Sequence, residues 1–490
     1  MVYFSEFFQL SDDVVEDYGA FNISLINDLP LFIDPFLLFG SEKVEYQKLH
    51  HEILDYLVFL KEKSSEGAMS LGQIKAWYYF SEVKQNWLGY SLFGNGGSGL
   101  GEKFGTALSS SMHLIFGDLQ KEKITISSHL EKAGLFSIGV GKDNISDFTC
   151  NLIKGYLLEY TEAFTLKYLS ESQRKKVKVK KVYFDYNLER WMPKEYTLPY
   201  HQNDYILLTP KDILTKDENW INNQDLLGDF NNICGSIPNE QLRIEIQNYL
   251  NKAIPKSHNK KPPAQKDINK AMYATINQFP VIIEYYIKKK EENKEGAKRT
   301  SKFKVKEVES VFIKNVQILV EQLRNLTDFY STSEGDAHTE ALKRVHFMKH
   351  VIEDNEGYKI FYYNGNPIKR EADLQVIYRL TWYASIHDVN REVNNGRGPV
   401  DYAISSGIKD KVLVEFKLAS NTQLKRNLQN QVAVYEKANQ TSNSLKVILY
   451  FDNSEYMKVN KILKELSLDS DPNIILIDAG CDNKKSASKV

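Results

Sequence analysis

Residues Lys411 to Leu418 read Lys-Val-Leu-Val-Glu-Phe-Lys-Leu, and this stretch decides the fold of the last third of the chain. Its period-two alternation predicts a β-strand that carries Glu415 and Lys417 on the same face. Burying an acid and a base on a mostly apolar strand is costly unless they pair, bind a metal or take part in chemistry. The two side chains are therefore the first candidates for a functional site. The opposite face of the strand holds Val412, Val414, Phe416 and Leu418.

A second predicted strand precedes this one. It reads Val400-Asp-Tyr-Ala-Ile-Ser, and the turn residues 406–410 separate it from the first strand, so the two runs predict a hairpin. Asp401 on the neighbouring strand can then reach the patch formed by Glu415 and Lys417. Mg²⁺ prefers carboxylate and water oxygen, and it is usually held by one or two protein carboxylates plus substrate phosphate. Two carboxylates beside one lysine therefore indicate a magnesium site.

Helices are predicted before and after the hairpin. The first opens at Glu371, where a carboxylate in the first turn suits the helix dipole. The second, over residues 421–439, places Gln431 and Tyr435 one turn apart. Apolar runs at residues 445–451 and 473–478 predict two more buried strands. The order is helix, strands, helix and strand, and the apolar face of the first helix holds Leu374, Ile377, Tyr378 and Trp382.

Four sequence elements in this order resemble the PD-(D/E)xK nuclease superfamily, and the last resembles the Q-x-x-x-Y motif of its RecB-like branch. They are Glu371, Val400-Asp401, Glu415-Phe416-Lys417 and Gln431-x-x-x-Tyr435, within residues 365–452. The resemblance implies a restriction-endonuclease-like core, in which helices flank a mixed sheet, and metal-dependent cleavage of phosphodiester bonds in DNA. Val400 departs from the family pattern, because it stands where the family has proline. The predicted strand and helix contexts strengthen the match.

The resemblance also implies roles at the predicted metal. Asp401 and Glu415 would be the ligands of Mg²⁺, for which Mn²⁺ could substitute. Glu371 would be an outer ligand or the acid that orients water. Lys417 would stabilise charge or position the attacking water.

Substrate contacts are predicted at three further positions. Gln431 and Tyr435 follow from the resemblance. Arg397 lies between two glycines shortly before Asp401, and the sequence leaves open whether it approaches a phosphate or caps the turn.

The 490 residues predict two to four folding units in an α/β (α+β) multidomain chain. We expect a mostly helical, acidic accessory domain over residues 1–170, in which residues 46–63 show the apolar spacing of a helix. A middle accessory domain would cover residues 171–335, a nuclease-like domain 340–480 and a flexible tail 481–490. Residues 251–270 and 288–306 look like charged linkers or surface loops.

Lysine and valine alternate from Lys176 to Lys180, which predicts a strand with one wet face. Two interpretations stay open. The lysines can guard an exposed edge strand against aggregation, which we favour, or they can contact phosphate.

Several other classes of protein are disfavoured. Cys150, Cys234 and Cys481 lack the spacing of a disulfide framework or a thiolate zinc site. No signal peptide or membrane span is apparent, so we expect a cytoplasmic protein. The glycine-rich run from Phe93 to Lys103 is not a phosphate-binding loop, because Glu102 separates the last glycine from the lysine.

The sequence thus predicts a Mg²⁺-dependent endonuclease acting on DNA, by analogy one of a bacterial restriction or anti-phage defence system. Its partners would be DNA and either a second copy of the chain or another protein of such a system, with no membrane. One alternative is a non-catalytic nucleic-acid-binding or sensor protein that keeps the nuclease fold. Another is a structural protein in which Glu415 and Lys417 merely pair.

Overall fold

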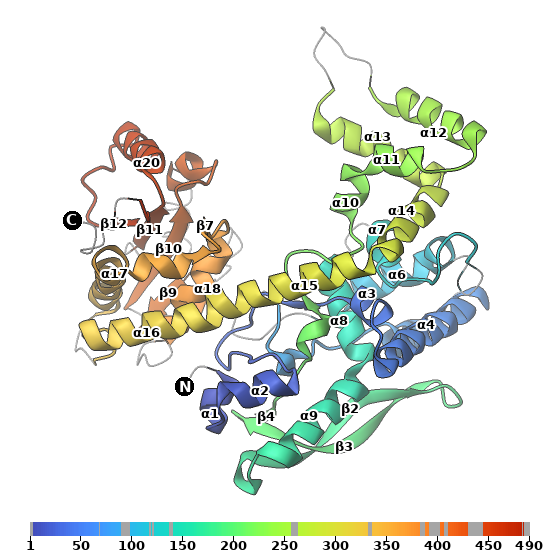
Figure 1. The fold of residues 1–490 in the computed structure, drawn as a ribbon, viewed down its shortest axis with the longest axis horizontal. Coiled ribbons are helices and arrows are strands. Elements are labelled where there is room, and N and C mark those ends of the chain that lie inside the picture. The colour runs from blue at the N-terminus through green and yellow to red at the C-terminus, as the bar shows by residue number, and fades with distance from the viewer. Residues whose placement is uncertain are drawn as a thin grey trace.

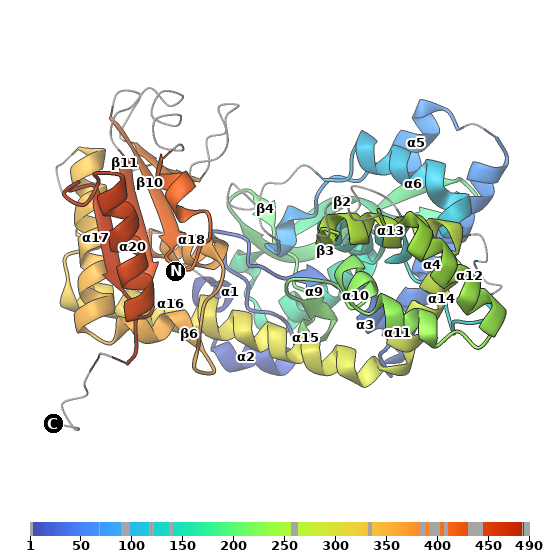
Figure 2. The ribbon, with the colours of Figure 1, turned by 90° about the horizontal axis from the view of Figure 1, so that it is seen from above.

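The computed structural model describes residues 3–67, 69–89, 99–116, 119, 122–136, 141–255, 263–331, 336–382, 388–391, 402–405, 410–429, 444–482 and 484. In this part of the chain, helices accompany three small sheets and one larger mixed sheet near the carboxyl end. Figures 1 and 2 show the large sheet and its helices beside the rest of the chain, which a long helix joins to it. The expectation of an α/β multidomain chain is confirmed at this level.

The amino-terminal region is mostly helical. Its longest helix, α4 (Val44–Ser65), buries the predicted stripe of Leu49, Ile53, Leu57 and Leu60. That prediction of a helix is confirmed. The other elements here are α1 (Phe4–Phe8), α2 (Asp12–Tyr18), β1 (Phe32–Ile33), α3 (Pro35–Phe39), α5 (Leu71–Trp77), α6 (Glu102–Ile115), α7 (Lys132–Phe136), α8 (Lys142–Leu152) and α9 (Lys154–Tyr168).

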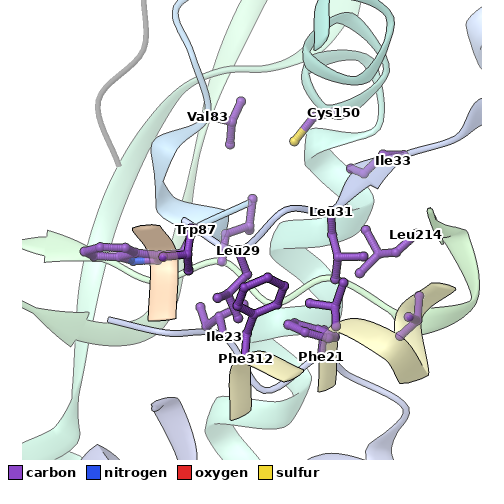
Figure 3. Close-up of a cluster of buried hydrophobic side chains, with 14 of the residues drawn as sticks. Phe21, Ile23, Leu29, Leu31, Ile33, Val83, Trp87, Cys150, Leu214 and Phe312 are labelled. Atoms are coloured by element: carbon purple, nitrogen blue, oxygen red, sulfur yellow. The ribbon is translucent and has the colours of Figure 1, made fainter. Parts of the chain in front are cut away.

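The amino-terminal segment lies in the core rather than at its edge. Figure 3 shows Phe21, Ile23 and Leu29 in one buried cluster with Phe312, nearly 300 residues further along the chain. Strand β1 pairs antiparallel with β5 (Leu214–Thr215), so the chain returns to this core twice. Segments distant in sequence therefore have to come together before the cluster can form.

A long hairpin follows α9. It consists of β2 (Arg174–Asp185) and β3 (Arg190–His201), and β4 (Asp204–Tyr205) pairs with the end of β3. The alternating lysine and valine run lies in β2, so the predicted strand is confirmed, and β2 is an edge of its sheet. Lys176 and Lys178 are exposed, whereas Val179 is buried. This arrangement matches a lysine-guarded edge, while phosphate binding stays an untested prediction.

The middle helices form a second buried cluster with part of α3. They are α10 (Asn223–Gly228), α11 (Phe230–Gly235), α12 (Glu240–Ala253), α13 (Gln265–Gln278) and α14 (Val281–Glu292). The prediction of a charged loop over residues 288–306 was wrong, because α14 and α15 (Lys294–Glu309) cover it apart from Asn293. Lysine and glutamate favour helices, and Ala297, Ser301 and Val305 recur every four residues as a buried stripe.

One continuous helix links the two halves of the molecule. It comprises α15, a π-helical segment (Ser310–Lys314) and α16 (Asn315–Leu326), and it is about 50 Å long. Figure 1 shows it in yellow, running from the middle helices to the carboxyl-terminal sheet. In the π segment, the Tyr3 hydroxyl donates a hydrogen bond to the Phe312 carbonyl. The segment therefore sits where the helix meets the amino-terminal core.

The carboxyl-terminal sheet has the strand order β12-β11-β10-β9-β8. Strand β10 (Lys411–Leu418) pairs antiparallel with β9 (Tyr402–Ser405) and parallel with β11 (Ser444–Tyr450). Strand β12 (Ile474–Asp478) is parallel to β11, and β8 (Asp388–Arg391) is antiparallel to β9. The predicted strand at residues 411–418 is confirmed, with Glu415 and Lys417 alternating against an apolar face.

Helices cover both faces of this sheet. The face with Val412, Val414 and Phe416 belongs to the cluster that includes α16, α17 (Ala337–Asp354) and α18 (Glu371–Thr381). The opposite face packs on α20 (Asn453–Glu465) and on the helical residues 424–429. Between α17 and α18 lie β6 (Tyr362–Tyr363) and β7 (Asn366–Pro367), and short 3₁₀ turns occur at Lys84–Asn86, Glu171–Gln173, Lys211–Ile213 and Gly357–Phe361.

Among the described residues, the helices are either too short or too polar to cross a lipid bilayer.

His50 of α4 is buried and contacts the segment that precedes α7. Its ring Nε2 lies 3.0 Å from the Ser127 hydroxyl oxygen, and only 5% of His50 is exposed. Burial lowers the pKa of His50 to about 3, and the neighbouring His129 and His51 act in the same direction. The folded protein therefore keeps this ring neutral at pH values where the unfolded chain protonates it.

We expect the free energy of unfolding to fall with pH below about 6.5 because of His50. Each pH unit between 6.5 and 3 costs about 1.4 kcal/mol, since the unfolded chain alone takes up the proton. When the pH is lowered from 7 to 5, the free energy of unfolding should fall by about 2 kcal/mol more in the wild type than in His50→Gln. Urea unfolding at the two pH values measures this difference. Equal losses in the two proteins would show that His50 is protonated in the fold.

Candidate active site

The candidate site centres on β10. Both Glu415 and Lys417 are 8% exposed, although they point away from the apolar face that packs on α17 and α18. Buried charges are stable only when opposite charges or hydrogen-bonding groups accompany them. The neighbours of this strand therefore decide what the two side chains can do.

The sheet register brings a second lysine to Glu415, which the sequence analysis missed. Lys446 of β11 is the direct cross-strand partner of Glu415, and it is 5% exposed. Directly paired residues in a sheet share a face, so Lys446 and Lys417 flank the carboxylate on one side of the sheet. The only signal in the sequence was a lone lysine inside the apolar run of residues 445–451.

Glu371 connects α18 to the end of β10. One carboxylate oxygen accepts hydrogen bonds from the Asn421 side-chain amide at 2.7 Å and from the Leu418 backbone N–H at 3.3 Å. The other oxygen lies 3.5 Å from the Lys417 ammonium nitrogen. The structure thus brings together two of the residues that the sequence motif singles out, from positions 46 apart in the chain. Asn421 was not predicted as a member of the site.

Ion pairs from the middle of the chain hold the first turn of α18, next to Glu371. Arg370 forms an ion pair with Asp217, which also lies 2.7 Å from Lys304 of α15. Asp217 has a left-handed backbone, with φ of +75°. Non-glycine residues seldom adopt that conformation, although aspartate tolerates it better than most.

Lys216 forms the buried part of this network. Its ammonium nitrogen is 2.9 Å from Glu307 of α15 and 3.6 Å from Asp373 of α18, and its side chain is 3% exposed. Burial raises the pKa of Asp373, while Lys216 and Arg370 act in the opposite direction. Arg370 and Asp373 therefore fix the turn that presents Glu371 to Lys417.

Several predicted site residues lie outside the described part of the chain. These are Asp401, Arg397, Gln431 and Tyr435. Residues 93–98 of the glycine-rich run and most of the tail at residues 481–490 also lie outside it. Strand β9 begins at the residue that follows Asp401, and that residue, Tyr402, pairs with Val414. Within the described residues, no group of three or more histidine, cysteine or acidic side chains forms a ready metal cage.

The described residues of the site supply two carboxylates, Glu371 of α18 and Glu415 of β10, and two lysines. The lysines are Lys417 of β10 and Lys446 of β11. Such a mixture can bind an anion through the lysines, and it can hold a cation through the carboxylates when further oxygen ligands are present. The roles given to individual residues by the sequence motif stay predictions.

Two separate parts of the chain match known family models. Residues 9–222 match a family model described as a domain of unknown function (DUF8370), and residues 337–453 match another domain of unknown function (DUF8371). The second match begins at the first residue of α17 and contains β10 and α18. No curated protein and no solved structure matches the chain.

We expect Lys216→Met to lower the free energy of unfolding by about 3 to 5 kcal/mol, because it leaves buried Asp373 without its main counter-charge. Lys304→Met is the matched control: Lys304 is 29% exposed, and we expect a loss of about 1 kcal/mol or less. Both values can be measured by urea unfolding. The double variant Lys216→Met/Asp373→Leu should recover part of the lost free energy of unfolding, because the second substitution removes the buried carboxylate that no longer has a counter-charge. A loss below about 1 kcal/mol in Lys216→Met would mean that solvent screens the network.

Proposed function

We propose that this protein is a metal-dependent endonuclease that hydrolyses phosphodiester bonds in DNA. The observation that carries the proposal is the contact between Lys417 and Glu371, made beside the buried Glu415. These three residues come from two of the elements in the PD-(D/E)xK motif. A structural salt bridge alone would not require a second acid and a second lysine, Lys446, at the same place on the sheet.

The topology of the sheet also supports a restriction-endonuclease-like core. The resemblance implies a mixed sheet flanked by helices, and β9, β10 and β11 provide one antiparallel and one parallel pairing. Helix α18 carries the first acid of the motif, and helices lie on both faces. The assignment to this fold is part of the proposal.

Its position in the sequence supports Asp401 as a member of the site. Asp401 directly precedes Tyr402, which pairs with Val414, the neighbour of Glu415 in β10. We assign Asp401 and Glu415 as the direct ligands of the metal, and Glu371 as an outer ligand or the acid that orients water. Bound there, Mg²⁺ or Mn²⁺ would offset phosphate charge and make a water more acidic.

The other residues act on the substrate directly. Lys417 is held by Glu371, and its positive charge can oppose the negative charge that develops on the scissile phosphate. Gln431 and Tyr435 are assigned to substrate contacts, in line with the sequence motif. Arg397, which lies between two glycines before Asp401, is assigned to a phosphate contact. The large preceding regions would recognise DNA, regulate cleavage or bind a partner protein or a second copy, as in bacterial restriction or anti-phage systems.

A non-catalytic DNA-binding or sensor protein is the second candidate. This second candidate is favoured if Glu371 only connects α18 to β10. Both carboxylate oxygens of Glu371 already have partners. Cleavage assays on plasmid, linear and single-stranded DNA, each with Mg²⁺, Mn²⁺ or EDTA, separate the two candidates.

We expect Glu415→Gln to abolish cleavage while the protein stays folded, because it removes a ligand charge but keeps the side-chain shape. Glu465→Gln is the matched control: this acid lies on α20, is 40% exposed and pairs with Lys425. It should cleave like the wild type. Asp401→Asn should also lose cleavage, whereas Lys417→Ala should lose about 10²-fold or more in turnover with DNA affinity nearly kept.

These variants also test the proposal itself. If the wild type cleaves no DNA with either metal, the nuclease assignment fails. If Glu415→Gln and Lys417→Ala lose folding and activity together, the two residues form a structural ion pair, since breaking a buried pair costs about 3 to 5 kcal/mol.

We expect DNA binding in EDTA to weaken steeply with salt, because lysine and arginine contacts to phosphate release counterions. Lys425 and Arg426 are exposed on the helical residues 424–429, close in sequence to the site. Arg426→Gln should lower the slope of log affinity against log salt by about 1. Fluorescence anisotropy with a labelled duplex measures this slope, and an affinity that does not change with salt would rule out a phosphate-binding surface.

A further inference from the structure

An aromatic pocket lies outside the candidate active site, between α4, the junction of α8 with α9, and the β2–β3 hairpin. Its volume is about 240 Å³. Pockets that take drug-sized ligands measure roughly 300 to 1,000 Å³, so the occupant of this pocket is a smaller molecule. Figure 1 shows α4, α9 and the hairpin in the half of the molecule that does not carry the β10 sheet. The described residues of the wall include six aromatic side chains, Tyr56, Tyr156, Tyr183, Phe184, Tyr186 and Trp191.

The rings of this wall stand at steep angles to one another. The ring planes of Phe184 and Tyr186 are inclined by 79°, with their centroids 5.1 Å apart, and those of Tyr56 and Phe184 by 75° at 5.0 Å. The Trp191 indole N–H donates a hydrogen bond to the Tyr56 hydroxyl at 3.0 Å, which fixes the floor of the pocket. Rings at such angles line a box rather than a flat stack, and the face of each ring carries the negative part of its quadrupole.

Two of these rings remain open to solvent. Tyr183 and Tyr186 are each 48% exposed, whereas Tyr56 is buried in the core and Phe184 packs against it. Leu188, two residues beyond Tyr186, is 53% exposed. Exposed apolar side chains that gather beside a concave pocket are typical of a binding site. Tyr183 and Tyr186 are therefore available to a ligand.

The charge of the wall is negative. Glu52 of α4 is the only charged residue among the described residues that line the pocket. Its ion pair with Lys48, at 3.6 Å, is exposed to solvent, and pairs of this kind stabilise a protein little. Burial raises the pKa of Tyr186 to about 12, and the carboxylates of Asp55 and Glu52 act in the same direction. The open side of the pocket thus favours a cation over an anion such as phosphate.

We propose that this pocket binds a small organic cation of the choline class, whose alkylated ammonium group lies against the rings of Tyr183 and Tyr186 and near the carboxylate of Glu52. Aromatic faces attract such ions, and their methyl groups suit apolar walls. Divalent metal ions need several oxygen ligands, and a primary ammonium group has three N–H donors that need acceptors. The described wall supplies one carboxylate and otherwise mainly rings and aliphatic groups. The site does not depend on the proposed nuclease function.

The test uses the full chain and choline chloride, with sodium chloride at the same ionic strength as the reference. Calorimetry measures binding, and the fluorescence of Trp191, which lines the pocket, reports where the ligand binds. The neutral alcohol 3,3-dimethyl-1-butanol is the matched ligand, because it has the shape of choline without the charge. Tyr186→Leu removes a ring and Glu52→Gln removes the negative charge. Both side chains are about half exposed, so both variants should fold.

Each variant has a matched control outside the wall. Tyr273→Leu removes a tyrosine of α13 that is 38% exposed. Glu62→Gln changes an exposed acid of the same helix as Glu52. Trp191→Phe keeps an aromatic ring in the wall but removes the fluorescent group.

We expect choline to bind the wild type about tenfold more tightly than the neutral alcohol, and to bind Tyr186→Leu and Glu52→Gln about threefold or more weakly than the wild type. Tyr273→Leu and Glu62→Gln should bind choline like the wild type. Trp191→Phe should still bind it in the calorimeter but lose most of the fluorescence change. The proposal is overturned if choline does not bind the wild type, if the neutral alcohol binds as tightly as choline, or if Tyr186→Leu and Glu52→Gln bind choline as the wild type does.

Discussion

The helix over residues 294–326 contributes to one continuous buried cluster that extends from the amino-terminal segment to the β10 sheet. Its π segment at residues 310–314 lies between these two parts, and an extra residue in a helical turn rotates the following face by about 100°. Phe312 is buried against the amino-terminal residues, whereas α16 packs against the helices of the β10 sheet. Because α15 carries Lys304 and Glu307, the same helix sets where residues 216 and 217 meet the first turn of α18. The candidate active site thus depends on the whole chain rather than on its last third.

That dependence involves three residues at the start of α18, Arg370, Glu371 and Asp373. Arg370 and Asp373 face charges from the middle of the chain, and Glu371 between them faces Lys417 and the end of β10. In an interior of low dielectric constant, a charge that loses its partner costs far more than it does in water. A displacement of residues 216 and 217 would therefore change the position of Glu371. This is one physical reason for the carboxyl-terminal sheet and its helices to remain attached to the large preceding regions.

Two buried acids in this structure illustrate different solutions to the same problem. Glu415 has Lys446 as its cross-strand partner and Lys417 two residues along the same strand, so its charge is balanced by the protein. Glu131 has the buried acid Asp34 beside it, and burial together with Asp34 raises the pKa of Glu131. The pairing of Glu415 with Lys417 was visible in the alternation of β10, whereas the place of Lys446 was not. The pairing of Asp34 with Glu131 was not visible either, because the two residues are far apart in the sequence and no short motif joins them.

The sequence by itself determined the elements whose periodicity is local. The strand at residues 411–418, the helix that opens at Glu371, the helix α4 and the lysine-rich β2 could all be predicted, because a buried face repeats every two or every three to four residues. Only the tertiary structure decided which of these elements meet. The register placed Lys446 beside Glu415, and residues 216 and 217 became the support of α18. Pairing register and long-range ion pairs depend on contacts between distant segments, which local hydrophobic spacing does not encode.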